Sequence, residues 1–156
     1  MISAQTKARI QEMKGEYPSA RSALMPALEL VQREVGYLPP EALREVADLM
    51  ELPPIEAASV ASFYTMFNRK PTGKHVIQVC TNLSCSLMGA SHIVDALRRK
   101  LGIAVGQTTS DGRFTLMAVE CLGSCGTAPM MQVDDTYYEN LTEEKLDAIL
   151  ADLSRV

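Results

Sequence analysis

The sequence lacks three features: a long apolar run, a basic stripe and a C-x-x-C motif. Its longest apolar runs are interrupted by charged residues, Pro or Gly well before the roughly 18 residues that a membrane-spanning helix needs, so we expect no membrane span. The net charge of −4 is spread about evenly along the chain, which leaves no basic surface for phosphates and argues against nucleic acid as a partner. Without C-x-x-C, a dithiol–disulfide enzyme is disfavoured.

The N-terminus has neither the apolar segment of a secretory signal nor the Arg-rich pattern of a transit peptide, and we expect a cytoplasmic protein. Because thiols stay reduced in that compartment, the four cysteines are expected to be metal ligands or redox groups rather than disulfides. The 156 residues, 47% of them hydrophobic and 22% charged, suffice for one globular domain or two small units.

Residues 1–70 are predicted to be helical. Apolar residues recur at helical spacing through 24–35, and pairs of prolines then introduce predicted helices over 40–50 and 55–67. Pro26 either occupies a tolerated position early in its helix or kinks it. A polar segment with Pro and Gly follows residue 68 and marks the end of the helical part.

Residues 71–156 change to short β-branched segments alternating with helices. The predicted order is a strand at 75–80, a helix at 89–101, strands at 114–120, 130–133 and 137–138, and a closing helix that begins near Thr142. The first strand, helix and second strand form a crossover unit, which makes the two strands parallel and places their C-terminal ends on one edge of the sheet.

The cysteines are Cys80, Cys85, Cys121 and Cys125. The first member of each pair lies at the end of a predicted parallel strand, so both pairs are expected at the same edge of the sheet. Four thiolates can hold Zn²⁺ or an iron–sulfur cluster. The wide C-x4-C and C-x3-C spacings, and loops at 81–89 and 122–128 without acidic residues, favour a cluster, with structural zinc and unmetallated thiols as the alternatives.

The remaining polar and aromatic candidates have plainer interpretations. His75 and His92 lie outside the cysteine loops and are interpreted as surface or helix residues. The Tyr pair at 137–138 is interpreted as packing. We find no candidate catalytic nucleophile or general base.

Several stretches carry a resemblance to a known family. They are Q-R-E-V-G-Y-L-P-P at 32–40, A-S-F-Y-T-M-F at 61–67, P-T-G-K at 71–74, T-S-D-G at 109–112, and V-E-C-L-G-S-C at 119–125 running to A-P at 128–129. Together with Cys80, Cys85 and Gly89, they resemble the NuoE-type 2Fe-2S subunit of NADH:quinone oxidoreductase, respiratory complex I. The resemblance covers nearly the whole chain.

The resemblance implies an α+β protein, with an N-terminal helical bundle at 1–70 followed by a thioredoxin-like α/β domain at 71–156 that carries one 2Fe-2S cluster. It implies four ligands, Cys80, Cys85, Cys121 and Cys125. The cluster would exchange one electron at a time with the FMN of an adjacent NADH-oxidising flavoprotein of the NuoF type, and this chain would bind neither FMN nor NADH itself. Such a subunit belongs to the peripheral arm of complex I, on the cytoplasmic side of a bacterial inner membrane.

Two alternatives remain beside the respiratory subunit. Equivalent diaphorase subunits serve NAD-linked hydrogenases and formate dehydrogenases, and a zinc-bearing structural subunit would transfer no electrons. Phe63 and Phe67, four residues apart on a predicted helix, are expected to be interior, although with Tyr64 they could instead anchor the flavoprotein. The net charge of −4, with few cations beside the cysteine loops, predicts a low reduction potential.

Overall fold

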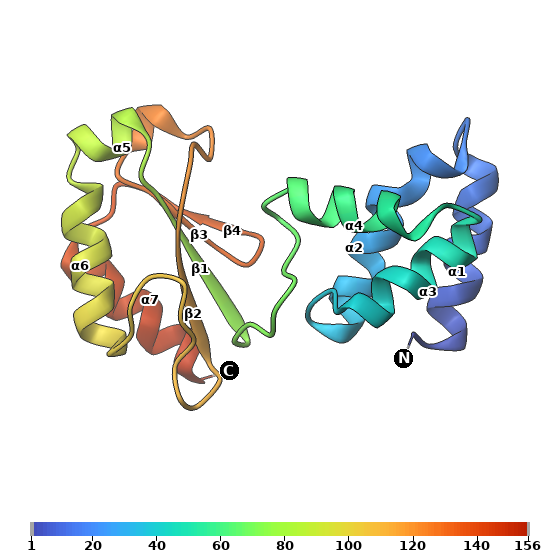
Figure 1. Ribbon diagram of the computed structural model, residues 1–156. Coiled ribbons are helices and arrows are strands. Elements are labelled where there is room, and N and C mark those ends of the chain that lie inside the picture. The colour runs from blue at the N-terminus through green and yellow to red at the C-terminus, as the bar shows by residue number, and fades with distance from the viewer. Residues whose placement is uncertain (1, 156) are drawn as a thin grey trace. The chain divides into compact units, whose positions relative to one another are not determined.

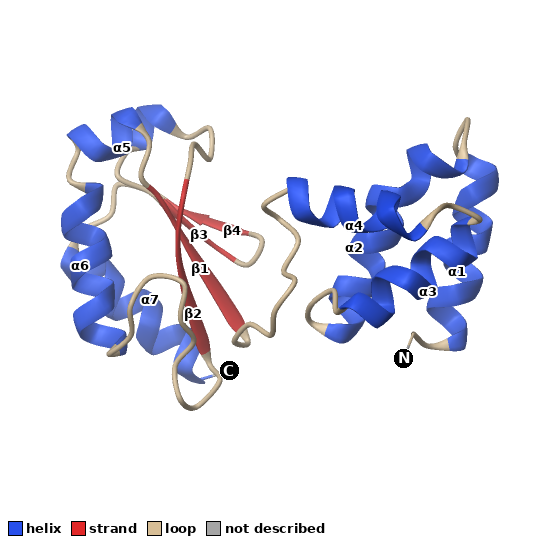
Figure 2. Cartoon of the chain, in the orientation of Figure 1, coloured by secondary structure: helices blue, strands red, loops and turns tan. Residues whose placement is uncertain are grey.

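The computed structural model describes residues 2–155, and the chain divides between Pro71 and Thr72 into two compact units. We call Met1–Pro71 the helical unit and Thr72–Val156 the sheet unit. Figure 1 traces the chain through both units, and Figure 2 shows that the strands belong to the second of them. No helix among residues 2–155 is long and apolar enough to cross a membrane.

The helical unit is built from four α-helices and one short 3-10 helix. These are α1 (Ala4–Glu16), η1 (Ala20–Ala23), α2 (Leu24–Val35), α3 (Pro40–Met50) and α4 (Pro54–Phe63). Each α-helix contributes buried side chains to one core, exemplified by Ile10, Leu28, Val46 and Ala57. Pro26 is the third residue of α2, where its missing N–H would have had no partner within the helix, so it occupies the tolerated position.

The last helix of this unit is shorter than the sequence predicts, because it ends at Phe63 rather than continuing to residue 67. Tyr64 leaves the helical conformation with φ −89° and ψ 118°. The segment beyond it is held by Gln32 of α2, whose Nε2 donates to the carbonyl of Met66 at 2.9 Å and whose Oε1 accepts from the N–H of Asn68 at 2.6 Å. A side chain from another helix thus replaces the backbone pattern that would have extended α4.

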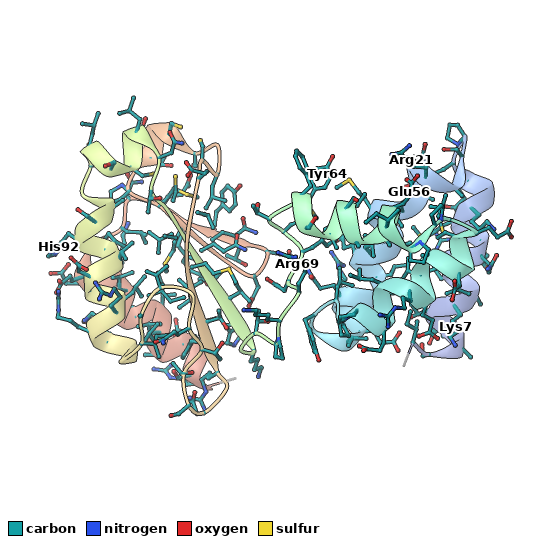
Figure 3. All side chains as sticks on the ribbon, viewed as in Figure 1. Lys7, Arg21, Glu56, Tyr64, Arg69 and His92 are labelled. Carbon is teal, nitrogen blue, oxygen red and sulfur yellow. The ribbon has the colours of Figure 1, made fainter. Side chains whose placement is uncertain are left out.

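The break separates two aromatic residues that a continuous helix would place on one face. Phe67 is 6% exposed and lies in the core, as expected, whereas Phe63 is 77% exposed, so its interior interpretation is wrong. Phe63 and Tyr64 form an edge-to-face pair with ring centroids 5.1 Å apart. Tyr64 stands at the end of α4 in Figure 3. The helical unit therefore carries an exposed aromatic pair.

The sheet unit follows the predicted order of elements, with two additions, the short helix α5 and the 3-10 helix η2. Its elements are β1 (His75–Cys80), α5 (Leu83–Leu87), α6 (Ala90–Leu101), β2 (Phe114–Val119), the 3-10 helix η2 (Cys125–Thr127), β3 (Met131–Val133), β4 (Thr136–Tyr138) and α7 (Glu143–Arg155). The strands lie in the order β2-β1-β3-β4. Helices α6 and α7 cover the same face of the sheet in Figure 2, and their apolar side chains share its core.

The strand pairing confirms the crossover predicted from the sequence. Strands β1 and β2 are parallel, with His75 opposite Phe114 and Cys80 opposite Val119, while β3 is antiparallel to both β1 and β4. The C-terminal ends of β1 and β2 therefore meet at one edge of the sheet. This mixed four-stranded sheet with two helices on one face is the thioredoxin-like arrangement.

The two histidines have different environments. His92 lies on α6 with its side chain 66% exposed, 3.1 Å from Glu143, and it points outward in Figure 3, as expected for a surface helix residue. His75 is only 8% exposed and begins β1, so its interpretation as a surface or helix residue is wrong. Its Nδ1 lies 2.7 Å from Asp134 Oδ2 in the turn between β3 and β4, a partner 59 positions away that local sequence does not reveal.

Candidate metal centre

All four cysteines lie at or beyond the C-terminal ends of the two parallel strands. Cys80 is the last residue of β1 and Cys85 lies within α5, while Cys121 follows β2 and Cys125 begins η2. All four are free thiols. Helix α5 and the 3-10 helix η2 contact each other, and Figure 1 shows them side by side at one end of the sheet. The structure thus brings the two predicted pairs to the same edge.

Within this edge the sulfurs are arranged as two pairs. Cys121 Sγ and Cys125 Sγ are 3.7 Å apart, close to the roughly 3.8 Å separation of two thiolates that bind one metal tetrahedrally at about 2.3 Å. The Cys80 and Cys85 thiols influence each other's pKa, and the charge of Cys80 acts to raise the pKa of Cys125. Among residues 2–155, no group of three or more His, Cys, Asp or Glu side chains surrounds a single ion position.

Backbone N–H groups favour the thiolate forms of these cysteines. The N–H of Gly123 donates to Cys121 Sγ at 3.3 Å. The backbone of Asn82 and Leu122 acts to lower the pKa of Cys80, and the backbone of Met130 acts to lower the pKa of Cys85. Such donors stabilise thiolates because they place partial positive charge beside the sulfur.

The pKa values of the thiols differ with their surroundings. Burial opposes ionisation of Cys80, but the backbone donors and the Cys85 thiol outweigh burial and lower its pKa. Burial, followed by the contact with Cys80, raises the pKa of Cys85. The pKa of Cys125 is raised by its hydrogen bond to Cys121 and by the charge of that neighbour. In each pair, the contact with the neighbouring cysteine and its charge help to raise the pKa of one thiol.

The loop that carries Cys85 is a short helix, which the sequence analysis missed. Helix α5 is capped by Asn82, whose Oδ1 accepts from the N–H of Leu83 at 2.7 Å. Gly89, at φ +94°, then turns the chain from α5 into α6, a conformation that favours glycine. Because α5 has only five residues, it is too short for helical periodicity to predict it from the sequence.

The loop that carries Cys121 and Cys125 is held by β4 and by the residue that follows it. Tyr137 Oη donates to the carbonyl of Leu122 at 2.7 Å. Glu139 accepts hydrogen bonds from the hydroxyls of Ser124 and Thr127, the latter at 2.6 Å. Sequence reasoning gave neither Tyr137 nor Glu139 a role at the site, since both are distant from the cysteines along the chain and no motif includes them.

Acidic side chains therefore reach the cysteine loops from outside, although the loops themselves contain none. Besides Glu139, the carboxylate of Glu120 accepts from Asn82 Nδ2 at 3.0 Å and raises the energy of the Cys80 thiolate through its charge. At this edge of the sheet, neutral N–H groups lie at the sulfurs, and the carboxylates of Glu120 and Glu139 contact other residues of the cysteine loops.

The surface beside the sulfurs is apolar. Leu83, Leu87 and Met88 are 71%, 78% and 61% exposed, and all three belong to or directly follow the helix that holds Cys85. Tyr137, which contacts the other loop, is 48% exposed. We call these four residues the apolar rim. An exposed patch of this kind, bordering a site, is typical of a surface that binds another protein.

A thioredoxin-like sheet with two pairs of cysteines at one edge defines the class of a small cysteine-ligated metal or iron–sulfur protein. Residues 10–154 match the family described as thioredoxin-like [2Fe-2S] ferredoxin, and the chain belongs to that family. The expectation of an α+β protein with a thioredoxin-like domain is thereby confirmed.

Curated relatives share nearly half of their residues with this chain. It is 48% identical over 138 residues to a subunit of NADH-quinone oxidoreductase from Rickettsia bellii, covering 86% of this chain and 83% of the relative. It is 46% identical to a subunit of NADH-quinone oxidoreductase from Thermus thermophilus, covering 92% of this chain and 81% of the relative. The similarity to the complex I subunit predicted from the sequence is confirmed.

A solved structure of an NAD⁺-reducing [NiFe]-hydrogenase in the air-oxidised state is also similar. It superposes with a TM-score of 0.74 at 26% identity. The match covers 85% of this chain and only 23% of the hydrogenase chain, so the chain corresponds to one part of that longer protein.

Proposed function

We propose that this chain is the electron-transfer subunit of an NADH:quinone oxidoreductase, with one 2Fe-2S cluster held by Cys80, Cys85, Cys121 and Cys125. The observation that carries the proposal is the convergence of two cysteine pairs at one edge of a thioredoxin-like sheet. The high identity to oxidoreductase subunits over most of their length supports the parent complex. The chain is an oxidoreductase subunit and holds no complete active site of its own.

The donor set fits such a cluster. A two-iron cluster takes two thiolates at each iron, and the 3.7 Å separation of Cys121 and Cys125 suits two ligands of one metal. When bound, the cluster supplies a site that accepts and returns one electron. The backbone N–H groups of Gly123, Asn82 and Leu122 offset the negative charge that four thiolates and two sulfides bring to this edge.

The apolar rim is the surface on which we place the partner. An electron donor must approach the sulfurs closely, and the rim residues are exposed and belong to, directly follow or contact the elements that hold the cysteines. The proposed partner is the NADH- and FMN-binding flavoprotein subunit of the NuoF type. The chain would then act as part of a peripheral arm on the cytoplasmic side of a bacterial inner membrane.

The first experiment is metal analysis with spectroscopy on anaerobically purified protein. We expect two irons and two acid-labile sulfides per chain, a red-brown colour, and a paramagnetic signal that appears only after reduction with dithionite. A colourless protein with one zinc per chain would support the structural-subunit alternative and refute electron transfer.

The second experiment tests the rim. Replacing Leu87 with Asp puts a charge on a residue that is 78% exposed, so the isolated subunit keeps its fold and its iron content while its affinity for the flavoprotein falls. Val105→Asp is the matched control, because Val105 is an exposed apolar residue of the same unit outside the cysteine loops. Equal affinity of the two variants for the flavoprotein, measured by calorimetry, would refute the proposal that the flavoprotein binds at the apolar rim.

A diaphorase subunit of an NAD-linked hydrogenase is the second candidate, favoured by the TM-score of 0.74 to the hydrogenase structure. The corresponding subunit of a formate dehydrogenase belongs to the same alternative. The two candidates differ in the activity of the complex isolated from its native source through a tag on this chain. NADH-dependent quinone reduction supports the respiratory subunit, whereas hydrogen- or formate-dependent NAD⁺ reduction supports the alternative.

A further inference from the structure

Glu139 holds the second cysteine loop by a branched set of hydrogen bonds. Its Oε1 accepts from Thr127 Oγ1 at 2.6 Å and from the hydroxyl of Ser124, and these two hydroxyls are themselves 2.8 Å apart. Ser124 directly precedes Cys125, and Thr127 closes the same 3-10 turn. The carboxylate is therefore hydrogen-bonded to residues on both sides of Cys125 in the sequence.

The carboxylate of Glu139 forms no ion pair among the described residues. The Lys145 ammonium lies nearby but donates to the backbone carbonyls of Glu139 and Asn140, at 3.2 and 2.9 Å. The hydroxyls of Ser124 and then Thr127 lower the pKa of Glu139, so the carboxylate is ionised at neutral pH.

We propose that Glu139 is a positioning residue that fixes the Cys121–Cys125 loop and, through its negative charge, lowers the reduction potential of the cluster. The inference rests on the proposed function, because it concerns the cluster assigned there. It goes further by naming a residue outside the cysteine loops that sets the driving force of electron transfer.

The direction of the effect follows from charge alone. Two ferric irons, two sulfides and four thiolates carry a charge of −2, and one electron taken from the reduced partner makes it −3, with no bond made or broken. A fixed negative charge destabilises the −3 state more than the −2 state, so it makes reduction harder. Ser124 and Thr127 keep that charge close to the site by binding it.

The test is a redox titration of the purified holoprotein, followed by electron paramagnetic resonance. Glu139→Gln keeps an oxygen that can accept from both hydroxyls and removes the charge. We expect the ratio of oxidised to reduced cluster at a fixed potential to change about threefold to tenfold, a rise in midpoint potential of about 28 to 59 mV for a one-electron couple. Glu139→Asp retains the charge, so its midpoint potential is expected to stay close to that of the wild type.

Asp152→Asn is the matched control, because it removes one charge from the C-terminal half of α7, away from the cysteine edge (Figure 1). A shift in Glu139→Gln no larger than in Asp152→Asn would overturn the proposal. So would an equal shift in Glu139→Asp and Glu139→Gln, since geometry rather than charge would then be responsible. Raising the salt concentration should shrink the Glu139→Gln shift, because exposed charges are screened.

Iron and sulfide assays on each variant keep the two proposals distinguishable. If the wild-type protein holds no cluster, no titration curve exists and the proposed function fails. If the wild type titrates with two irons and two sulfides while the potential of Glu139→Gln does not move, the role of Glu139 alone is refuted.

Discussion

Replacing Gly73 with Ala tests a close approach between two backbone segments of the sheet unit. A Cβ atom at this position would lie 2.8 Å from both the N and the C atom of Phe114 and 2.9 Å from the C atom of Arg113. These are backbone atoms of the neighbouring strand, so no side chain can rotate away. The N–H of Gly73 also donates to the buried Thr115 Oγ1 at 2.6 Å, and relief of the clash would stretch this hydrogen bond.

The cost can be estimated from these two terms. Forcing an extra carbon into a packed site typically costs about 1–3 kcal/mol. Weakening a hydrogen bond to a buried hydroxyl costs about 1–3 kcal/mol more. Because one backbone shift both relieves the clash and stretches this hydrogen bond, the two costs overlap. We expect Gly73→Ala to destabilise the sheet unit by about 2–4 kcal/mol, a large share of the roughly 5–15 kcal/mol that keeps a domain folded.

The measurement is hydrogen exchange on the intact protein, which reports the free energy of opening for each strand separately. Amides of β1 and β2 should lose protection, while those of the helical unit should not. Gly15→Ala is the control, because it adds the same methyl group within α1 with no atom outside its own helix within 4 Å, and it should be neutral or stabilise by up to about 1 kcal/mol. Unchanged protection of β1 in Gly73→Ala would show that the approach is not sterically limiting.

Three further outcomes are expected. Cys125→Ala should lose most of its iron and sulfide by direct assay, and full retention of both would contradict its assignment as a ligand. Phe63→Ala should change the unfolding free energy by less than about 0.5 kcal/mol because the ring is 77% exposed, whereas Phe67→Ala, at 6% exposed, should cost about 3–5 kcal/mol in a urea titration. The Lys7 contact lowers the pKa of Glu45 in the folded protein. The contact therefore stabilises the fold fully above the pKa of about 4.3 that Glu has in the unfolded chain, and this stabilisation is lost as pH falls through the lower pKa of the folded protein. Thermal melts should show this loss below about pH 4.3, and Glu45→Gln should reduce it.

The parts of the fold that the sequence predicted correctly depend on local patterns. The β-branched run at 75–80 and the apolar spacing of 24–35 each determine one element within a few residues of their bounds. The parallel pairing of β1 and β2 follows from the length of the crossover between them, and the structure confirms it. That pairing alone brings the two cysteine pairs to one edge, while their role as ligands stays a prediction.

The parts that sequence reasoning missed depend on contacts between distant residues. Gln32 ends α4 by binding the chain beyond it, and once the helix stops, the spacing of Phe63 and Phe67 no longer implies a shared face. His75 is buried, and its Nδ1 is paired with Asp134 in the turn between β3 and β4. Neither partner is adjacent in sequence, so no periodicity could reveal the pair.

The same reason applies to the cysteine edge. Ser124 can donate a hydrogen bond to Glu139 only because β3 and β4 turn the chain back past the loop. Composition of the loop correctly shows that it contains no acid, yet it cannot show which acids fold against it. Charge near a metal centre is a property of the folded chain rather than of the motif.

The dependence of the second cysteine loop on residues 137–141 sets an order of events during synthesis. Besides Tyr137 and Glu139, the N–H of Asn140 donates to the carbonyl of Thr127 at 2.8 Å, and the N–H of Leu141 to that of Pro129 at 2.9 Å. When Cys125 is added to the growing chain, none of these groups has yet been made. The second cysteine loop is therefore held in its folded form only after residues 137–141 have also emerged from the ribosome.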